Sequence, residues 1–153
     1  MAEDATIADT QRELKEDFEL LEDPRDRIEY IIDLGKRLAP LDERHKTEGN
    51  RVRGCQSQVW MVAELDEQAG RIHLAADSDA IIVKGLIALL LRLYDGRTAE
   101  EILANPPTVL EEIGLKNFLT PGRSNGLYSM INRIRQLAGI YAGVTPEARA
   151  AAG

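Results

Sequence analysis

The segment from Ala80 to Tyr94 constrains the fold more than any other part of this chain, because apolar residues occupy nearly every side of the helix that it predicts. Ser78 and Asp79 precede it as candidate cap residues. With about 15 residues and two basic side chains inside it, the segment falls short of the ~20 apolar residues of a membrane span. Gly85 within it costs about 1 kcal/mol relative to alanine, so we expect another backbone to pack closely there. The sequence therefore predicts a central helix that other elements cover on most sides.

Further helices are predicted on both sides of this central segment. Asp23 and Pro24 are typical of a helix start, and Thr98–Glu101 and Thr108–Glu111 have the spacing of capping boxes. Ser124 is a candidate cap for the last helix. The expected buried positions of the three longer helices are Ile7, Leu14, Phe18 and Leu21, then Ile28, Ile31, Ile32, Gly35 and Leu38, then Leu127, Met130, Ile131, Ile134, Leu137, Ala138 and Tyr141.

A small antiparallel sheet is predicted beside these helices. Gln58–Leu65 contains β-forming residues, Arg71–Ala75 alternates apolar with polar residues, and Asp66–Gly70 suits a hairpin turn. Two strands alone are marginally stable, so we expect a third strand around Asn50–Arg53. The predicted fold class is α+β, with a three-stranded antiparallel sheet packed against helices.

Length and charge restrict the domain organisation and the partners. The chain fits one domain over residues 1–153, with an ordered core of about 7–143 and a loose tail over 144–153. A net charge of −7 without a basic stripe argues against general binding to nucleic acid or to an anionic membrane. One cysteine forms no internal disulfide, and Met1–Thr10 lacks an apolar signal core, so we expect a reducing cytoplasm. Monomer and homodimer both stay open.

Cys55 is the only cysteine and the one strongly nucleophilic side chain. Gly54 before it permits unusual backbone angles, and the polar residues after it lead into the first predicted strand, which indicates a loop tip. Two arginines just upstream favour the thiolate, the form that attacks. The alternative is a small buried hydrophobic residue, the usual role of a lone cysteine in an intracellular protein.

Three motifs resemble the signature motifs of the SufE family. They are the heptapeptide Gly54–Trp60, the segment Asp77–Ile87 and the segment Leu119–Leu127, which stand in the family's order. The resemblance covers roughly Phe18 to Tyr141. Gly122 stands where we expect serine, a departure that we expect to affect loop stiffness more than chemistry.

This resemblance implies a SufE/IscU-like fold and the function of a sulfur acceptor and carrier. A SufS-like, pyridoxal-phosphate-dependent cysteine desulfurase would be stimulated by the chain and would pass persulfide sulfur to Cys55. A SufBCD-like iron–sulfur scaffold complex would then receive that sulfur. The cofactor would belong to the desulfurase, so no cofactor is expected here. The resemblance also implies that Arg123 lies near the cysteine and stabilises a thiolate or persulfide anion. The candidate partner contacts are the loop residues Gly54, Gln56, Ser57 and Gln58.

Other chemistry has less support in the sequence. His45, His73 and Cys55 lack the spacing of a metal site, and one thiol does not hold an iron–sulfur cluster of its own. Either histidine would act as the base of a cysteine hydrolase only if folding happened to bring it to the thiol. Asp79 is predicted to cap a helix and Lys84 to extend from an apolar helix face. A small-molecule thiol enzyme, a redox-sensing binding module and a structural interaction domain remain the alternatives.

Overall fold

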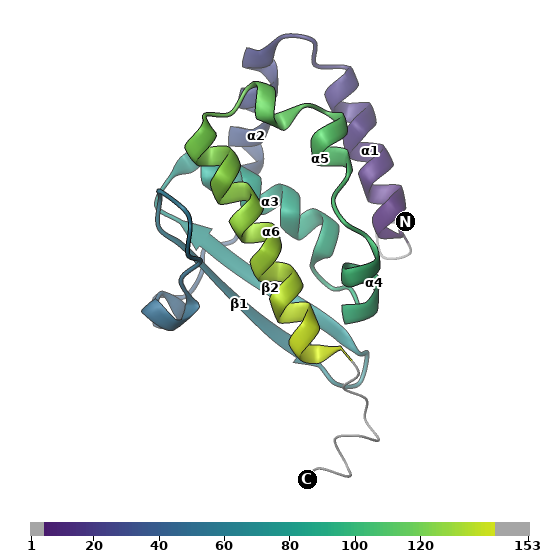
Figure 1. The fold of residues 1–153 in the computed structure, drawn as a ribbon, viewed down its shortest axis with the longest axis vertical. Coiled ribbons are helices and arrows are strands. Elements are labelled where there is room, and N and C mark those ends of the chain that lie inside the picture. Colours follow the sequence, from purple (N-terminus) through teal and green to yellow (C-terminus); the bar gives the residue numbers. More distant parts are fainter. Residues whose placement is uncertain (1–4, 143–153) are drawn as a thin grey trace.

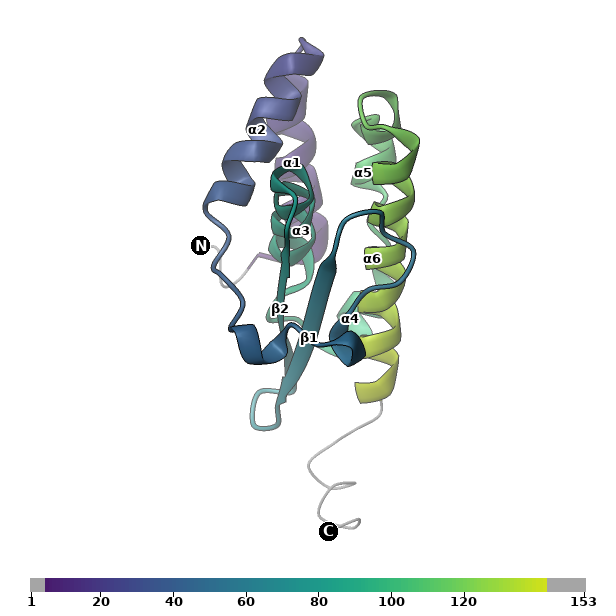
Figure 2. The same ribbon diagram turned by 90° about the vertical axis from the view of Figure 1, so that its left-hand side faces the viewer.

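The computed structural model describes residues 5–142, so the tail predicted over 144–153 lies outside the described residues. Figure 1 shows the arrangement of the elements, and Figure 2 shows α3 in the middle of the fold, with α1 and α2 on one side of it and α5 and α6 on the other. The hairpin of β1 (Val59–Asp66) and β2 (Arg71–Ser78) lies along one side of α3, which β2 contacts. The helices are α1 (Ile7–Glu19), α2 (Pro24–Lys36), α3 (Ile81–Tyr94), α4 (Ala99–Ala104), α5 (Val109–Glu112) and α6 (Pro121–Tyr141), with 3-10 turns η2 (Glu43–His45), η3 (Glu48–Asn50) and η4 (Leu115–Asn117).

The central position of α3 follows from its apolar composition. Leu86, Leu89 and Leu90 have no exposed surface, because α2, β2 and other elements cover this helix. The backbone of α2 approaches α3 at Gly85, where an added Cβ would overlap the carbonyl oxygen of Ile31. The predicted close backbone contact at Gly85 is therefore confirmed.

The sheet consists of β1 (Val59–Asp66) and β2 (Arg71–Ser78), which pair antiparallel with Val59 opposite Ser78. A tight turn joins them as predicted, with the Asp66 carboxylate accepting hydrogen bonds from the backbone of the turn. Side chains of β2 alternate between solvent and core, since Ile72 and Leu74 are buried while their neighbours are exposed. The hairpin thus covers the core with one face.

The third strand predicted around Asn50–Arg53 is wrong. This segment follows directly on η3 and turns again at Gly54, whose φ is +89°. One isolated bridge to β1 remains, with the Val52 N–H donating to the Val59 carbonyl oxygen at 2.8 Å. Two turns so close together leave too few extended residues for a ladder, and the sheet within residues 5–142 has two strands.

Three predicted helix starts are confirmed and one is wrong. Asp23 caps α2, and Thr98–Glu101 forms a complete capping box at α4. Thr108 directly precedes α5 as predicted, but it has helical backbone angles and makes no side-chain cap bond, so the predicted capping box does not form there. Ser124 lies inside α6, because Thr120 caps this helix and Pro121 occupies its first turn. The last helix therefore begins well before the start that a Ser124 cap predicts.

A buried carboxylate fixes the chain that leads to the cysteine. Asp77 is 4% exposed and accepts hydrogen bonds from the backbone N–H groups of Ser78 and Leu41. The ammonium groups of Lys46 and Lys84 lie 3.5 and 3.6 Å from its two oxygens. Burial raises the pKa of Asp77, but the two backbone donors and the two lysines outweigh it and hold the pKa below its ordinary value. Lys84 is thus an ion-pair partner and does more than extend from its helix.

Candidate functional site

Cys55 lies on a loop that hydrogen bonds close at both ends. On one side the Val52 N–H donates to the Val59 carbonyl oxygen at 2.8 Å, and on the other the Gln58 N–H donates to the Asp79 carboxylate at 3.0 Å. The prediction that Asp79 caps α3 is therefore wrong, since Ala80 is the N-cap residue and the Asp79 carboxylate binds the loop. Residues 53–57, here named the cysteine loop, are held at the start of β1.

Gly54 sets the direction of the cysteine loop. Its φ of +89° lies in the left-handed region, which strains any residue with a Cβ. A Cβ at this position would also lie 2.5 Å from the Oγ of Ser129 on α6. Backbone conformation and available space both require glycine directly before the thiol.

A cavity of about 110 Å³ opens beside the thiol, between the cysteine loop, α3 and α6. Apolar side chains of α3 and α6 form its base, and polar groups of the loop and of the start of α6 form its rim. Its lining residues are Cys55, Gln56, Ser57, Val83, Leu86, Gly122, Arg123, Gly126 and Met130. Three of the loop residues predicted from the sequence therefore share one cavity with Arg123.

Two glycines of α6 let the cysteine loop lie directly on this helix. A Cβ on Gly126 would be 3.6 Å from the Cys55 Sγ, an ordinary contact distance. A Cβ on Gly122 would overlap the side-chain amide of Gln56. The departure from the expected serine at Gly122 thus makes room for Gln56, an effect on packing that the sequence does not indicate.

The environment of Cys55 favours its protonated form. The thiol is half-buried, and this burial raises its pKa, while the nearby Arg51 guanidinium lowers the pKa by less. Its Sγ lies 3.6 Å from the carbonyl oxygen of Gly126, to which the S–H group donates. A carbonyl oxygen accepts a hydrogen bond from a thiol and repels a thiolate. In this position the cysteine is therefore a weak nucleophile.

Arg123 lies in the first turn of α6, at the rim of the cavity that contains Cys55. Its side chain is exposed, and its backbone N–H donates to the Thr120 hydroxyl at 3.3 Å. Arg51, which the sequence places just upstream of the cysteine, is the cation that lowers the pKa of Cys55 in this conformation. The described position of Arg123 leaves its guanidinium free to meet charge at the mouth of the cavity.

The two histidines lie outside this site. His73 is on β2 opposite Glu64, with its Nδ1 3.8 Å from the Asp95 carboxylate. His45 belongs to η2, where its carbonyl oxygen accepts a hydrogen bond from Asn50. Within residues 5–142, no group of three or more His, Cys, Asp or Glu side chains is arranged to hold a metal ion. No helix in this part of the chain has both the length and the apolar character needed to cross a membrane.

Comparison with known proteins assigns the chain to a family. The SufE family model, described as an Fe-S metabolism associated domain, matches residues 12–138. The chain belongs to the SufE family. A SufE-like protein of Rhizobium etli is 44% identical over 130 residues, which are 83% of this chain and 88% of that protein. A SufE-like protein of Synechocystis is 38% identical over 134 residues, covering 88% of this chain and 83% of its relative.

Two further SufE comparisons add a plant relative and a fold. SufE-like protein 1 of Arabidopsis thaliana, described as chloroplastic/mitochondrial, is 40% identical over 121 residues, which are 79% of this chain and 32% of that longer one. The solution structure of a hypothetical protein from Thermus thermophilus superposes with a TM-score of 0.73 at 23% identity, covering 88% of this chain and 97% of that one. This structural likeness concerns the fold alone, and it agrees with the predicted α+β class.

Two features of this SufE site escaped the sequence reasoning. Gly122 and Gly126 stand four positions apart, so they lie on one face of a helix, and this spacing was a usable signal for a surface that receives another backbone. The bond from the Gln58 N–H to Asp79 joins residues 21 positions apart and has no comparable sequence signal.

Proposed function

We propose that this SufE protein is a sulfur carrier that accepts persulfide sulfur on Cys55 from a pyridoxal-phosphate-dependent cysteine desulfurase. The Cys55 thiolate attacks the outer sulfur of the desulfurase persulfide and forms a new S–S bond. The old S–S bond breaks, and the desulfurase cysteine leaves as a thiolate. The step exchanges one S–S bond for another, so it needs no external oxidant or reductant.

The observation that supports this proposal is the position of the thiol, on a short tethered loop and over a cavity. An inert structural cysteine has no need of a glycine with positive φ beside it or of free volume in front of it. The cavity of about 110 Å³ exceeds the space that one water molecule needs, so it has room for one additional sulfur atom. A persulfide on Cys55 that returned to this position would be shielded from ambient thiols.

The resting position of the thiol implies that the loop moves before sulfur is transferred. As long as the S–H group donates to the Gly126 carbonyl, the thiol stays protonated and attack is slow. When the desulfurase draws the cysteine loop outward, the thiol loses both burial and this bond, and its pKa falls. Arg123 at the rim then stabilises the charged sulfur by a charge-assisted hydrogen bond.

In this proposal the protein is a carrier and activator, with no reaction of its own on a small molecule. Binding to a SufS-like desulfurase removes the persulfide from that enzyme and thereby stimulates its turnover. An iron–sulfur scaffold complex of SufBCD type receives the sulfur from Cys55. We place the protein in the cytoplasm, where thiols stay reduced and a shielded persulfide is an advantage.

An intact-mass experiment tests this function. The protein is incubated with a desulfurase and free cysteine, and a gain of about 32 Da that reduction removes is expected for the wild type. Cys55→Ser keeps the fold and gains no mass, because a hydroxyl is a far weaker nucleophile. Arg123→Ala gains mass more slowly at an unchanged thermal midpoint. Mass gain by Cys55→Ser would show that sulfur goes elsewhere, and an unchanged rate in Arg123→Ala would remove the arginine from the mechanism.

A further inference from the structure

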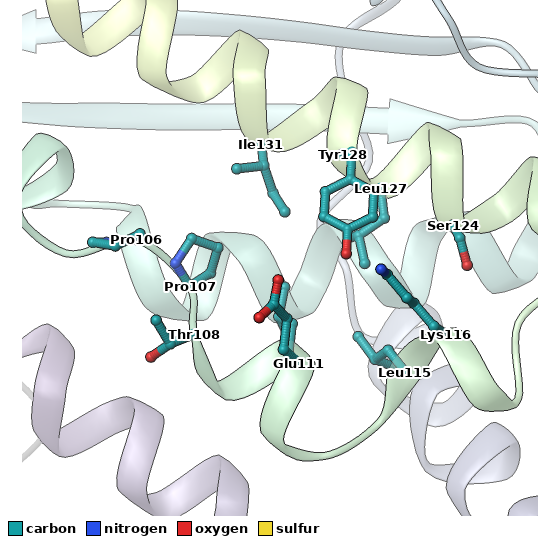
Figure 3. A pocket seen from close by; sticks show the side chains of 11 residues that line it. Pro106, Pro107, Thr108, Glu111, Leu115, Lys116, Ser124, Leu127, Tyr128 and Ile131 are labelled. Atoms are coloured by element: carbon teal, nitrogen blue, oxygen red, sulfur yellow. The ribbon is translucent and has the colours of Figure 1, made fainter.

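A second cavity, of about 140 Å³, lies between α5 and α6 (Figure 3). Its walls are apolar and come from the segment before α5, from α5 and η4, and from α6. The apolar groups that line it belong to Pro107, Leu110, Leu115, Leu127 and Ile131. Most of these side chains are also part of the core, so the cavity is a hollow in a rigid surface.

The size and lining of this hollow fit one apolar group. An apolar cavity of about 150 Å³ in another protein holds a single benzene molecule. The volume here, about 140 Å³, therefore matches one phenylalanine ring or one leucine side chain. Filling it would remove apolar surface from water on both partners, which is the general source of affinity at an anchor residue.

Two opposite charges stand at the mouth of the cavity. Figure 3 shows the Glu111 carboxylate and the Lys116 ammonium group pointing toward the cavity from α5 and η4. Both side chains are exposed, and neither forms an ion pair with any residue in the range 5–142. The Lys116 ammonium lies 5.6 Å from the centre of the Tyr128 ring on α6. These charges fit a protein segment in which a basic and an acidic residue flank one apolar side chain.

The second cavity is close enough to Cys55 for one bound protein to contact both. Arg123 and Gly126 line the cysteine cavity, whereas their sequence neighbours Ser124 and Leu127 line the second one, so one helix separates the two. Figure 1 shows α6 at the front of the fold, with the cysteine loop on one side of it and α5 on the other. A helix with its side chains is about 10 Å across. A protein that buries about 800 Å² around Cys55 covers a disc of roughly 16 Å radius, and therefore reaches across α6.

We propose that the cavity between α5 and α6 is an anchor site for one apolar side chain of the cysteine desulfurase, flanked by charges that pair with Glu111 and Lys116. This inference rests on the proposed function. A closed cysteine loop cannot itself hold the desulfurase before it opens, so the first contacts must form on a surface that needs no rearrangement. Such an anchor binds the open and the closed form of the protein equally, so it holds the desulfurase in place, and contacts that the desulfurase makes only with the open loop shift the loop outward.

The test fills the cavity from α6. Ser124→Phe places a ring in the hollow, and Gln136→Phe places the same ring on an exposed position of the same helix, outside both cavities. The rate of mass gain at Cys55 is measured over a range of desulfurase concentrations. Loss of the anchor raises the half-saturating concentration at least tenfold in Ser124→Phe and leaves it unchanged in Gln136→Phe. A charge exchange, Glu111→Lys with Lys116→Glu, raises it in the same way without adding volume.

The outcomes separate this inference from the proposed function. If the wild type gains sulfur and both Ser124→Phe and the charge exchange titrate like it, the anchor site is overturned and the sulfur carrier stands. An equal loss of affinity in Gln136→Phe, or a lower maximum rate without a change in half-saturation, overturns the anchor as well. A wild type that gains no sulfur overturns both. Sedimentation of the protein alone tests whether a second copy of the chain fills the cavity. A wild-type dimer that Ser124→Phe dissociates would assign the cavity to that second copy and overturn the desulfurase anchor.

Discussion

Two buried glycines in helices should respond to alanine in opposite directions. Gly126 lies in α6 against Cys55, and Gly85 lies in α3 against α2. Helix propensity alone predicts that each Gly→Ala substitution raises the free energy of unfolding by about 1 kcal/mol. A Cβ on Gly126 would have its nearest contacts at 3.6 to 3.9 Å, all with Cys55. Since nothing has to move, we expect Gly126→Ala to realise this gain of about 1 kcal/mol.

Gly85→Ala meets a different neighbour. Its Cβ would overlap the carbonyl group of Ile31, which belongs to the backbone of α2 and has no rotamer to change. Overpacking of this kind costs about 1–3 kcal/mol, and contact with a backbone places the cost at the upper end. After the propensity gain, we expect the free energy of unfolding to fall by about 2 kcal/mol.

Chemical denaturation measures both changes, and cysteine alkylation adds a local measurement. For a domain of this size, a gain of about 1 kcal/mol corresponds to a rise of about 2–4 °C in the thermal midpoint. The methyl group of Gly126→Ala lies against the Cys55 Sγ, so iodoacetamide should modify the thiol more slowly than in the wild type. Gly85→Ala serves as the control for a stability change away from the thiol. Stability changes of the same sign in the two variants would refute the reasoning from added Cβ atoms.

Three further predictions concern charged and titratable groups. Asp79→Ala frees the Gln58 N–H and should speed alkylation of Cys55 several-fold at an unchanged thermal midpoint; an unchanged rate would show that the Asp79 bond does not restrain the loop. Asp77→Asn should lower the free energy of unfolding at pH 7 by about 2 kcal/mol, since bonds from Ser78 and Leu41 lose a charged acceptor. Because the folded-state pKa of Asp77 is lowered, its contribution to the free energy of unfolding is present above the unfolded pKa of about 3.9 and is lost as the pH falls through the folded value. The free energy of unfolding of Asp77→Asn should therefore fall less steeply with decreasing pH than that of the wild type. The pKa of Cys55 is raised, so the wild type should lose stability as the pH rises above about 8.5 toward the folded value, and a Cys55→Ser variant with the same alkaline loss would contradict this assignment.

The helices were predictable because each carries its own signal. The apolar stretch of α3 and the Asp66 turn between the strands specify themselves within a few residues. The prediction of a third strand was wrong because a strand there depends on how many residues stay extended between two turns. That number is set by the surrounding structure and not by the segment itself. The start of α6 was missed although a signal existed, since Pro121 is typical of a first helical turn and pointed to Thr120 over Ser124 as the cap.

The motifs predicted which residues belong to the candidate site, but not how these residues pack. The motif resemblance directed attention to Cys55 and to Arg123, which lie 68 positions apart and line one cavity. Motifs do not report packing, so the contact of Gln56 with Gly122 was out of reach. The second cavity combines segments from Pro106 to Ile131 that have no shared pattern, and only their folded arrangement makes a hollow.

The two tethers of the cysteine loop limit how far a bound sulfur atom can travel. Cys55 is three residues from Val52 and three from Gln58, and an extended chain spans at most about 3.6 Å per residue, so its excursion is about 10 Å. A swinging arm that visits two docked enzymes at once needs a longer radius. Under the proposed function, the sulfur donor and the sulfur receiver would therefore bind the same surface in turn, each leaving before the other arrives. An excess of desulfurase that carries no persulfide should then slow sulfur delivery to the scaffold, because it competes with the scaffold for that one surface.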